Sequence, residues 1–217
     1  MVGTLRRSPR QGRSGETVER ILSAAAELLE EGGPEKATIA AIAVRADVQP
    51  GSIYHFFANR EAILGAIAGR LYDEVDRTIL SQLPQYLECL PWEQAVGRLL
   101  DTAYDAYLEH PTYRKLFLGG LRRSESFDEI RIKSDTELAY SLSGYLTAWG
   151  VAETDVLVVS GTVVRIANKL LDWCLETEDE SQRRAIRREA KRAVCAYLAS
   201  YIGPDPPVWC KNSIGEN

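Results

Sequence analysis

Apolar residues recur every three or four positions along most of the chain, which is the spacing of one buried helical face. The clearest case runs from about Glu16 to Glu31, where one face carries only apolar residues. No run alternates apolar and polar residues between turn signals, as a half-buried strand would. Length favours a helix even at the β-branched run from Val156 to Val159. The pattern therefore predicts an all-α fold.

Turn and cap residues divide this pattern into separate helices. Gly32-Gly33-Pro34 ends the first helix, Thr38 caps a second, Pro50 opens a third and Asn59 caps a fourth. We expect the fourth helix to end near Gln82, with Pro84 and Pro91 bracketing a short connection. The later helices are expected at 92–109, 113–118, 128–149, 154–177 and 180–202.

The stretch TIAAIAVRADVQPGSIYHFFANRE, residues 38–61, carries the functional signal. It predicts two short helices joined by a tight turn. The second helix places Ser52, Tyr54 and His55 near its exposed side and Ile53 and Phe57 near its buried side. A short polar-faced helix behind a basic arm is how a small protein reads DNA.

The charge distribution agrees with that reading although the whole chain carries −5. The first fifteen residues hold four arginines and no acid, and residues 1–60 hold eight Lys and Arg against seven Asp and Glu. Charge beyond about 8–10 Å is screened at physiological salt, so charge near the phosphates decides binding. An acidic remainder does not exclude a DNA-binding protein.

Over residues 16–80 the sequence resembles the TetR family of bacterial one-component regulators. The helix pattern, Thr38, the turn IAVRADV and the string GSIYHFFANRE carry this resemblance, because the family string is close to G-T-L-Y-H-Y-F-x-S/N-K-E. It implies a three-helix DNA-binding head and a helical body that binds a small-molecule effector and forms a homodimer. We therefore expect a basic arm at 1–15, a helix-turn-helix domain at 16–60, a ligand-binding and dimerisation domain at 61–203 and a loose tail at 204–217.

The resemblance also implies roles for single residues at a double-stranded DNA operator. Tyr54 matches a phosphate contact, His55 a phosphate or base contact, and Arg60 the usual phosphate-binding lysine. Gln49 leads the reading helix, where a glutamine can pair with adenine. The expected DNA-binding set is Arg6, Arg7, Arg10, Thr38, Gln49, Pro50, Gly51, Ser52, Tyr54, His55 and Arg60.

Three positions depart from the family pattern. Asp47 stands at the turn position that is usually glycine, and aspartate tolerates the left-handed conformation better than most residues. Gln49 replaces a small capping residue, and Ala58 stands where a lysine is frequent. The arginine arm either compensates by entering the minor groove or is only solubilising charge.

Two further sets follow from the family architecture and from the apolar stripes. The expected effector pocket is largely apolar with Asn168 as its polar member: Leu71, Val75, Leu99, Ala103, Tyr107, Phe117, Tyr145, Trp149 and Asn168. The alternative for the aromatic members is ordinary core packing. The expected dimer interface uses the last two helices: Val159, Val163, Ile166, Leu170, Ile186, Ala190, Val194, Tyr197 and Tyr201.

The sequence favours a ligand-responsive repressor released from a near-palindromic operator by a small apolar or aromatic ligand. One alternative is an adaptor whose head no longer binds DNA specifically. An enzyme is not expected: Asp101, Asp105 and Glu109 lie at i, i+4 and i+8 but no nucleophile or phosphate loop joins them. The four cysteines lack metal-ligand spacing, so no metal or cofactor is expected. With no membrane-length apolar run and no apolar leader, we expect a cytoplasmic protein.

Overall fold

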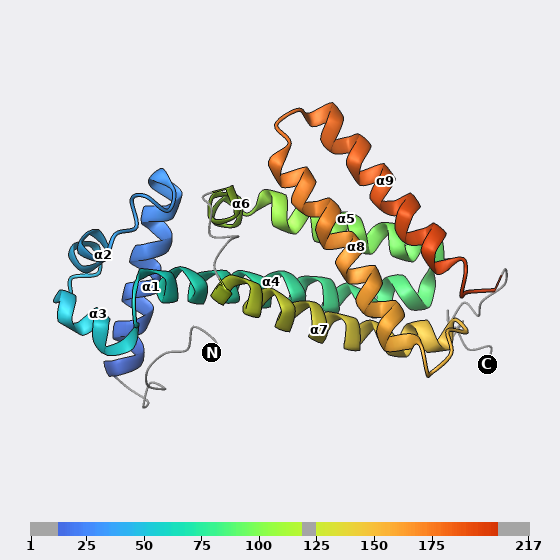
Figure 1. Cartoon of the computed structure of the whole chain (residues 1–217), viewed down its shortest axis with the longest axis horizontal. Helices are drawn as coiled ribbons and strands as arrows, with labels where there is room; N and C mark the ends of the chain where they lie inside the picture. The colour runs from blue at the N-terminus through green and yellow to red at the C-terminus, as the bar shows by residue number, and fades with distance from the viewer. Residues whose placement is uncertain (1–12, 119–124, 204–217) are drawn as a thin grey trace, which may run out of the picture. The chain divides into compact units, whose positions relative to one another are not determined.

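The computed structural model describes residues 13–118 and 125–203, and these residues are helical almost throughout (Figure 1). This confirms the all-α fold class. The helices are α1 (Arg13–Gly32), α2 (Ile39–Arg45), α3 (Pro50–Phe56), α4 (Arg60–Cys89), α5 (Trp92–Glu109), α6 (Pro111–Leu118), α7 (Glu125–Ala148), α8 (Val156–Glu176) and α9 (Glu180–Leu198). Helix α1 begins three residues before the expected start at Glu16, so the last part of the expected arm is helical.

The chain divides into two compact units. The first comprises Met1–Glu74 and Tyr107–Lys133, and the second comprises Val75–Ala106 and Ser134–Asn217. Helices α4, α5 and α7 therefore each carry residues of both units. A division by compactness does not show what each unit binds. The expected boundary near residue 60, between a DNA-binding and a ligand-binding domain, therefore remains a prediction.

In the first unit, α1 packs its apolar face against α2 and α6. Its stripe of Val18, Ile21, Leu22, Ala25, Leu28 and Leu29 is buried, as the spacing predicted. Near the C-terminal end of α1, the Thr112 hydroxyl of α6 donates to the Glu30 carboxylate at 2.6 Å, and the Lys115 ammonium donates to the Glu30 carbonyl. Four buried aromatic rings complete this unit: Tyr72, Tyr107, Tyr113 and Phe127.

The second unit is built around α8 and α9, which lie side by side as an antiparallel pair (Figure 1). Its core cluster includes Trp92 and Trp149, whose ring centroids lie 6.4 Å apart. A salt-bridge network joins α9 to α5, because Arg187 bonds Asp101 and Asp105 and Lys191 bonds Asp101.

The expected end of the fourth helix near Gln82 was wrong. Helix α4 continues through Pro84 to Cys89. A proline inside a helix costs about 3 kcal/mol, because it removes one hydrogen bond and crowds the preceding turn. Leu83 is buried in the core cluster of the second unit, and Tyr86 and Leu90 pack against that cluster. Burial of apolar side chains on both sides of Pro84 offsets this cost.

Candidate nucleic-acid interface

Local residues determine how α2 and α3 begin and end. The Thr38 hydroxyl accepts a hydrogen bond from the Ala41 amide at 3.2 Å, so Thr38 is the N-cap of α2 as expected. Asp47 takes the left-handed conformation with a φ of 51°, which turns the chain between the two helices. Pro50 occupies the first turn of α3, where its missing N–H leaves no bond unmade. The turn therefore forms without glycine.

Helix α3 has one buried and one exposed face. Ile53 and Phe57 are buried as expected, and Phe56 is buried as well. The Tyr54 side chain is 49% exposed, and His55 is exposed beside it. Gln49 makes no capping hydrogen bond, which leaves its amide available for another partner. The polar groups of α3 thus lie on the face that the core does not use.

The remaining members of the expected DNA-binding set differ in exposure. Thr38, Pro50 and Gly51 are exposed, Ser52 is partly buried and Arg60 is partly buried. The Arg60 guanidinium donates from Nε to the Ala37 carbonyl at 3.1 Å and from Nη2 to the Pro34 carbonyl at 2.5 Å. Its phosphate-binding role stays a prediction. Arg6, Arg7 and Arg10 lie outside the described residues.

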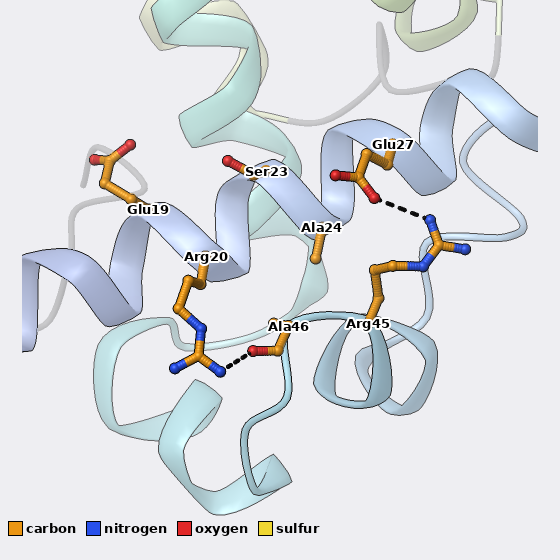
Figure 2. Close-up of a pocket in the computed structure, with 7 residues that line it drawn as sticks. All are labelled: Glu19, Arg20, Ser23, Ala24, Glu27, Arg45 and Ala46. Atoms are coloured by element: carbon orange, nitrogen blue, oxygen red, sulfur yellow. Dashed lines mark hydrogen bonds and ion pairs between the residues drawn. The ribbon is translucent and has the colours of Figure 1, made fainter.

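A second arginine, which the sequence analysis missed, contacts the turn. Arg20 of α1 donates from Nη2 to the carbonyls of Ala46 at 2.5 Å and Asp47 at 2.7 Å. Figure 2 shows its side chain reaching from α1 to Ala46. The sequence holds one indication of a special role, because Arg20 is the only basic residue between Ser14 and Glu35.

The groove between α1 and α2 in Figure 2 is lined by Glu19, Arg20, Ser23, Ala24, Glu27, Arg45 and Ala46. Its charges are paired: Arg45 lies 3.1 Å from Glu27 and 2.8 Å from Glu31. Arg70 of α4 bonds Glu19 at 2.5 Å and holds the pKa of that carboxyl below its usual range. The acids of α1 are therefore neutralised by neighbouring arginines on this side of the head.

Comparisons with known proteins agree with this geometry. The family model described as bacterial regulatory proteins, tetR family, matches residues 21–67. A second model, the Tetracyclin repressor-like C-terminal domain, matches residues 91–198. The chain belongs to the TetR family. It is accordingly a ligand-responsive, DNA-binding transcriptional regulator, and both parts of the TetR architecture are present.

Solved structures of TetR-family regulators have the same fold. A putative regulator from Mesorhizobium loti has a TM-score of 0.66 at 17% identity and covers 89% of this chain and 100% of its own. A regulator from Pectobacterium atrosepticum has a TM-score of 0.68 at 16% identity, covering 92% and 100%. One from Streptomyces coelicolor is 28% identical with a TM-score of 0.56, covering 86% and 99%. No curated protein matches the chain significantly.

The effector pocket expected from the TetR architecture stays a prediction. Its nine residues divide between the two units, with Leu71, Tyr107 and Phe117 in the first and the others in the second. Tyr107 is buried against Tyr113 with ring centroids 4.5 Å apart, whereas Trp149 packs in the other unit's core. The Asn168 amide donates to the Asp135 carboxylate at 2.6 Å, so Asn168 joins α8 to α7.

Burial separates the expected dimer-interface residues into two groups. Five have almost no surface left for a second copy, because they pack inside one chain: Val159, Val163, Ile186, Ala190 and Val194. Ile166, Leu170 and Tyr197 are partly buried, and Tyr201 is exposed. The apolar residues that α8 does expose are Leu157, Val158 and Trp173. The five buried residues therefore contribute to the packing of one chain, and the dimer interface itself stays a prediction.

The remaining candidate chemistry is used structurally. Asp101 and Asp105, two of the three carboxylates spaced along one helix, form salt bridges with Arg187 and Lys191. Burial raises the pKa of the Cys174 and Cys195 thiols, which disfavours the reactive thiolate. Among residues 13–118 and 125–203, no helix is long and apolar enough to cross a membrane.

Proposed function

We propose that this TetR-family regulator is a homodimeric repressor that binds a near-palindromic operator and that a small apolar or aromatic effector releases it. The DNA-binding part rests on one observation, which is that α3 has a buried apolar face and an exposed polar face. Its apolar residues Ile53 and Phe57 are buried, while Gln49, Tyr54 and His55 are exposed together with Thr38 before α2.

Each exposed group has chemistry that suits a duplex. The Gln49 amide can donate to and accept from an adenine edge in the major groove. The Tyr54 and Thr38 hydroxyls can donate to phosphate oxygens, which orient a protein without reading sequence. His55 reaches a phosphate or a base edge. Pro50, Gly51 and Ser52 are small, so the start of α3 can approach the groove floor closely.

The homodimer is proposed to form on the exposed face of α8 and the adjoining end of α9. Val158 is 71% exposed, Leu157 56% and Trp173 47% along α8, and Tyr201 adds an aromatic ring beyond α9. Exposed apolar side chains gathered on two packed helices are typical of an interaction surface. Two copies would place two reading helices on successive half-sites about one helical turn apart.

The proposed effector class rests on aromatic burial. Tyr72, Tyr107, Tyr113 and Phe127 come from four different helices and are all buried. Ligand sites are commonly lined by such side chains with a few polar groups, and the tyrosine hydroxyls provide those groups. We propose that the protein acts in the cytoplasm, where operator DNA is accessible.

Selection of bound duplexes from a random-sequence library tests the DNA-binding part. The expected result is one enriched near-palindrome, which footprinting on the gene's own upstream region should then locate. Recovery of no enriched motif, with only weak binding that physiological salt abolishes, would support the adaptor alternative. Addition of uncharged aromatic and aliphatic compounds to the complex should identify a class that releases the duplex.

Light scattering tests the dimer. The wild-type chain should have twice the monomer mass, and Val158→Glu should be monomeric because it places two like charges in the interface. Tyr140→Glu is the matched control, since Tyr140 is 72% exposed on α7, outside the proposed interface. A dimeric Val158→Glu variant would refute the assignment of this face.

A further inference from the structure

Helix α2 needs support from outside itself. It has seven residues, and only Ile42 and Ala43 within it are buried. An isolated helix this short is not stable in water, because nucleation costs more than one turn of hydrogen bonds returns. Nevertheless Thr38 and the turn that aims α3 lie at its two ends. Whatever holds those ends determines the surface presented to DNA.

The C-terminal end of α2 is held by Arg20. The last carbonyls of a helix have no intrahelical donor and carry the negative end of the helix dipole. One terminal nitrogen of Arg20 donates to the carbonyls of Ala46 and Asp47, and it lies 3.4 Å from the Asp47 carboxylate. A cation from α1 thus closes the end of α2 at the residue with positive φ.

The N-terminal end is held by Arg60. Arg60 is the first residue of α4, and its Nε and Nη2 atoms donate to the carbonyls of Ala37 and Pro34. Pro34 also accepts from the Ala37 amide at 3.1 Å, so the guanidinium binds the outside of a closed turn. Ala37 is fully buried and directly precedes Thr38. The position of Thr38 therefore depends on a residue 22 positions later in the chain.

Two carbonyls on one edge of a guanidinium require the planar fork of arginine. A lysine ammonium carries the same charge and reaches a phosphate equally well, but it cannot match both acceptors in this plane. The geometry therefore separates the two roles that Arg60 can have at a DNA surface.

We propose that Arg20 and Arg60 are positioning residues that clamp the two ends of α2, and that Arg60 supports DNA binding through the loop carbonyls rather than through a phosphate. Two experiments test this proposal. Measurement of DNA affinity rests on the proposed function, whereas measurement of amide hydrogen exchange does not, so the two can fail separately.

The first experiment measures affinity of full-length variants for the duplex selected by the wild type, as a function of salt. Arg60→Lys and Arg60→Gln should both weaken binding about tenfold at every salt concentration, with an unchanged salt slope. Arg70→Gln is the matched control, because it removes the same charge from the same helix. The Arg70 guanidinium bonds the side chain of Glu19 and no backbone carbonyl of the loop before α2. It should bind within about twofold of the wild type.

Each Arg60 variant has its own result that would overturn the proposal. A phosphate ligand at Arg60 predicts wild-type affinity for Arg60→Lys. It also predicts that Arg60→Gln lowers the salt slope by about 0.9 for each half-site. Either observation would return Arg60 to the phosphate contacts.

The second experiment measures amide hydrogen exchange in the free protein. Arg60→Lys should speed exchange about tenfold at Ala37 and Ile42, whose amides donate to Pro34 and Thr38. Arg20→Ala, which removes the single donor nitrogen that makes both bonds, should do so at Ala46 and Val48. Unchanged protection at these four amides would refute the clamp. If the wild type binds no DNA specifically, the proposed function fails while exchange still decides this inference.

Discussion

The pairs α2–α3 and α8–α9 each consist of two helices joined by a short connection. The sequence predicted which side chains are exposed in the first pair but not in the second. In α2–α3, short helices with strong start and stop residues leave one orientation, and Tyr54 and Ile53 lie on the faces expected. In α8–α9, apolar residues occupy more than one face. Periodicity alone could not say whether Val159 and Val194 face a second copy or the core of their own chain. Local turn chemistry is therefore a better guide to a functional surface than an apolar stripe.

The largest effect should come from the core that orients the reading helix. Phe57 is 1% exposed at the end of α3, so Phe57→Ala should lower the free energy of unfolding by about 3–5 kcal/mol. Urea denaturation followed by circular dichroism measures it. A loss below about 1 kcal/mol would mean that the head tolerates a cavity there, and α3 would be less rigidly oriented than its burial indicates.

The second effect tests the other hairpin. Val194 is fully buried in α9, so Val194→Ala should cost about 2 kcal/mol of unfolding free energy. The dimer dissociation constant should be unchanged, because the side chain lies inside one chain. Arg192→Ala is the control on the exposed side of the same helix and should change stability by less than about 0.5 kcal/mol. A weakened dimer without loss of core stability would restore Val194 to the interface.

The third effect concerns the turn. Asp47 has a φ of 51°, a conformation that a β-branched residue adopts only with strain. Asp47→Val should destabilise the protein by about 1–2 kcal/mol, whereas Asp47→Gly should keep or slightly raise the melting temperature. Differential scanning calorimetry compares the three proteins. Equal melting temperatures for valine and glycine would show that the turn is not fixed by backbone conformation.

The smallest effect is a pH dependence. The hydrogen bond from Arg70 lowers the folded-state pKa of Glu19. The stabilisation is present above the unfolded pKa of this carboxyl and is lost as pH falls through the lowered folded value. Because both side chains are about half exposed, the loss should be only a few tenths of a kcal/mol. Unfolding at pH 7 and pH 3 should show a difference that Arg70→Gln reduces; an identical pH dependence would mean that this pair adds nothing.

The residues that were predicted correctly act on near neighbours in sequence. Thr38 caps an amide three residues on, and Asn59 accepts from the Ala62 amide at 2.8 Å. Pro84 was misread for the opposite reason: packing by Leu83 and Tyr86 against distant helices decided that α4 continues. Arg20 was missed because its acceptors lie 26 and 27 positions away.

The sequence by itself determined the all-α fold, the faces of α3 and the left-handed turn at Asp47, because these depend on spacing and on backbone preferences of a few adjacent residues. Only the tertiary structure decided which apolar stripe of α8 and α9 is core, and that the guanidinium of Arg60 binds Pro34 and Ala37. Burial and long-range hydrogen bonds depend on which segments meet in space, and helical periodicity does not specify a helix's partner.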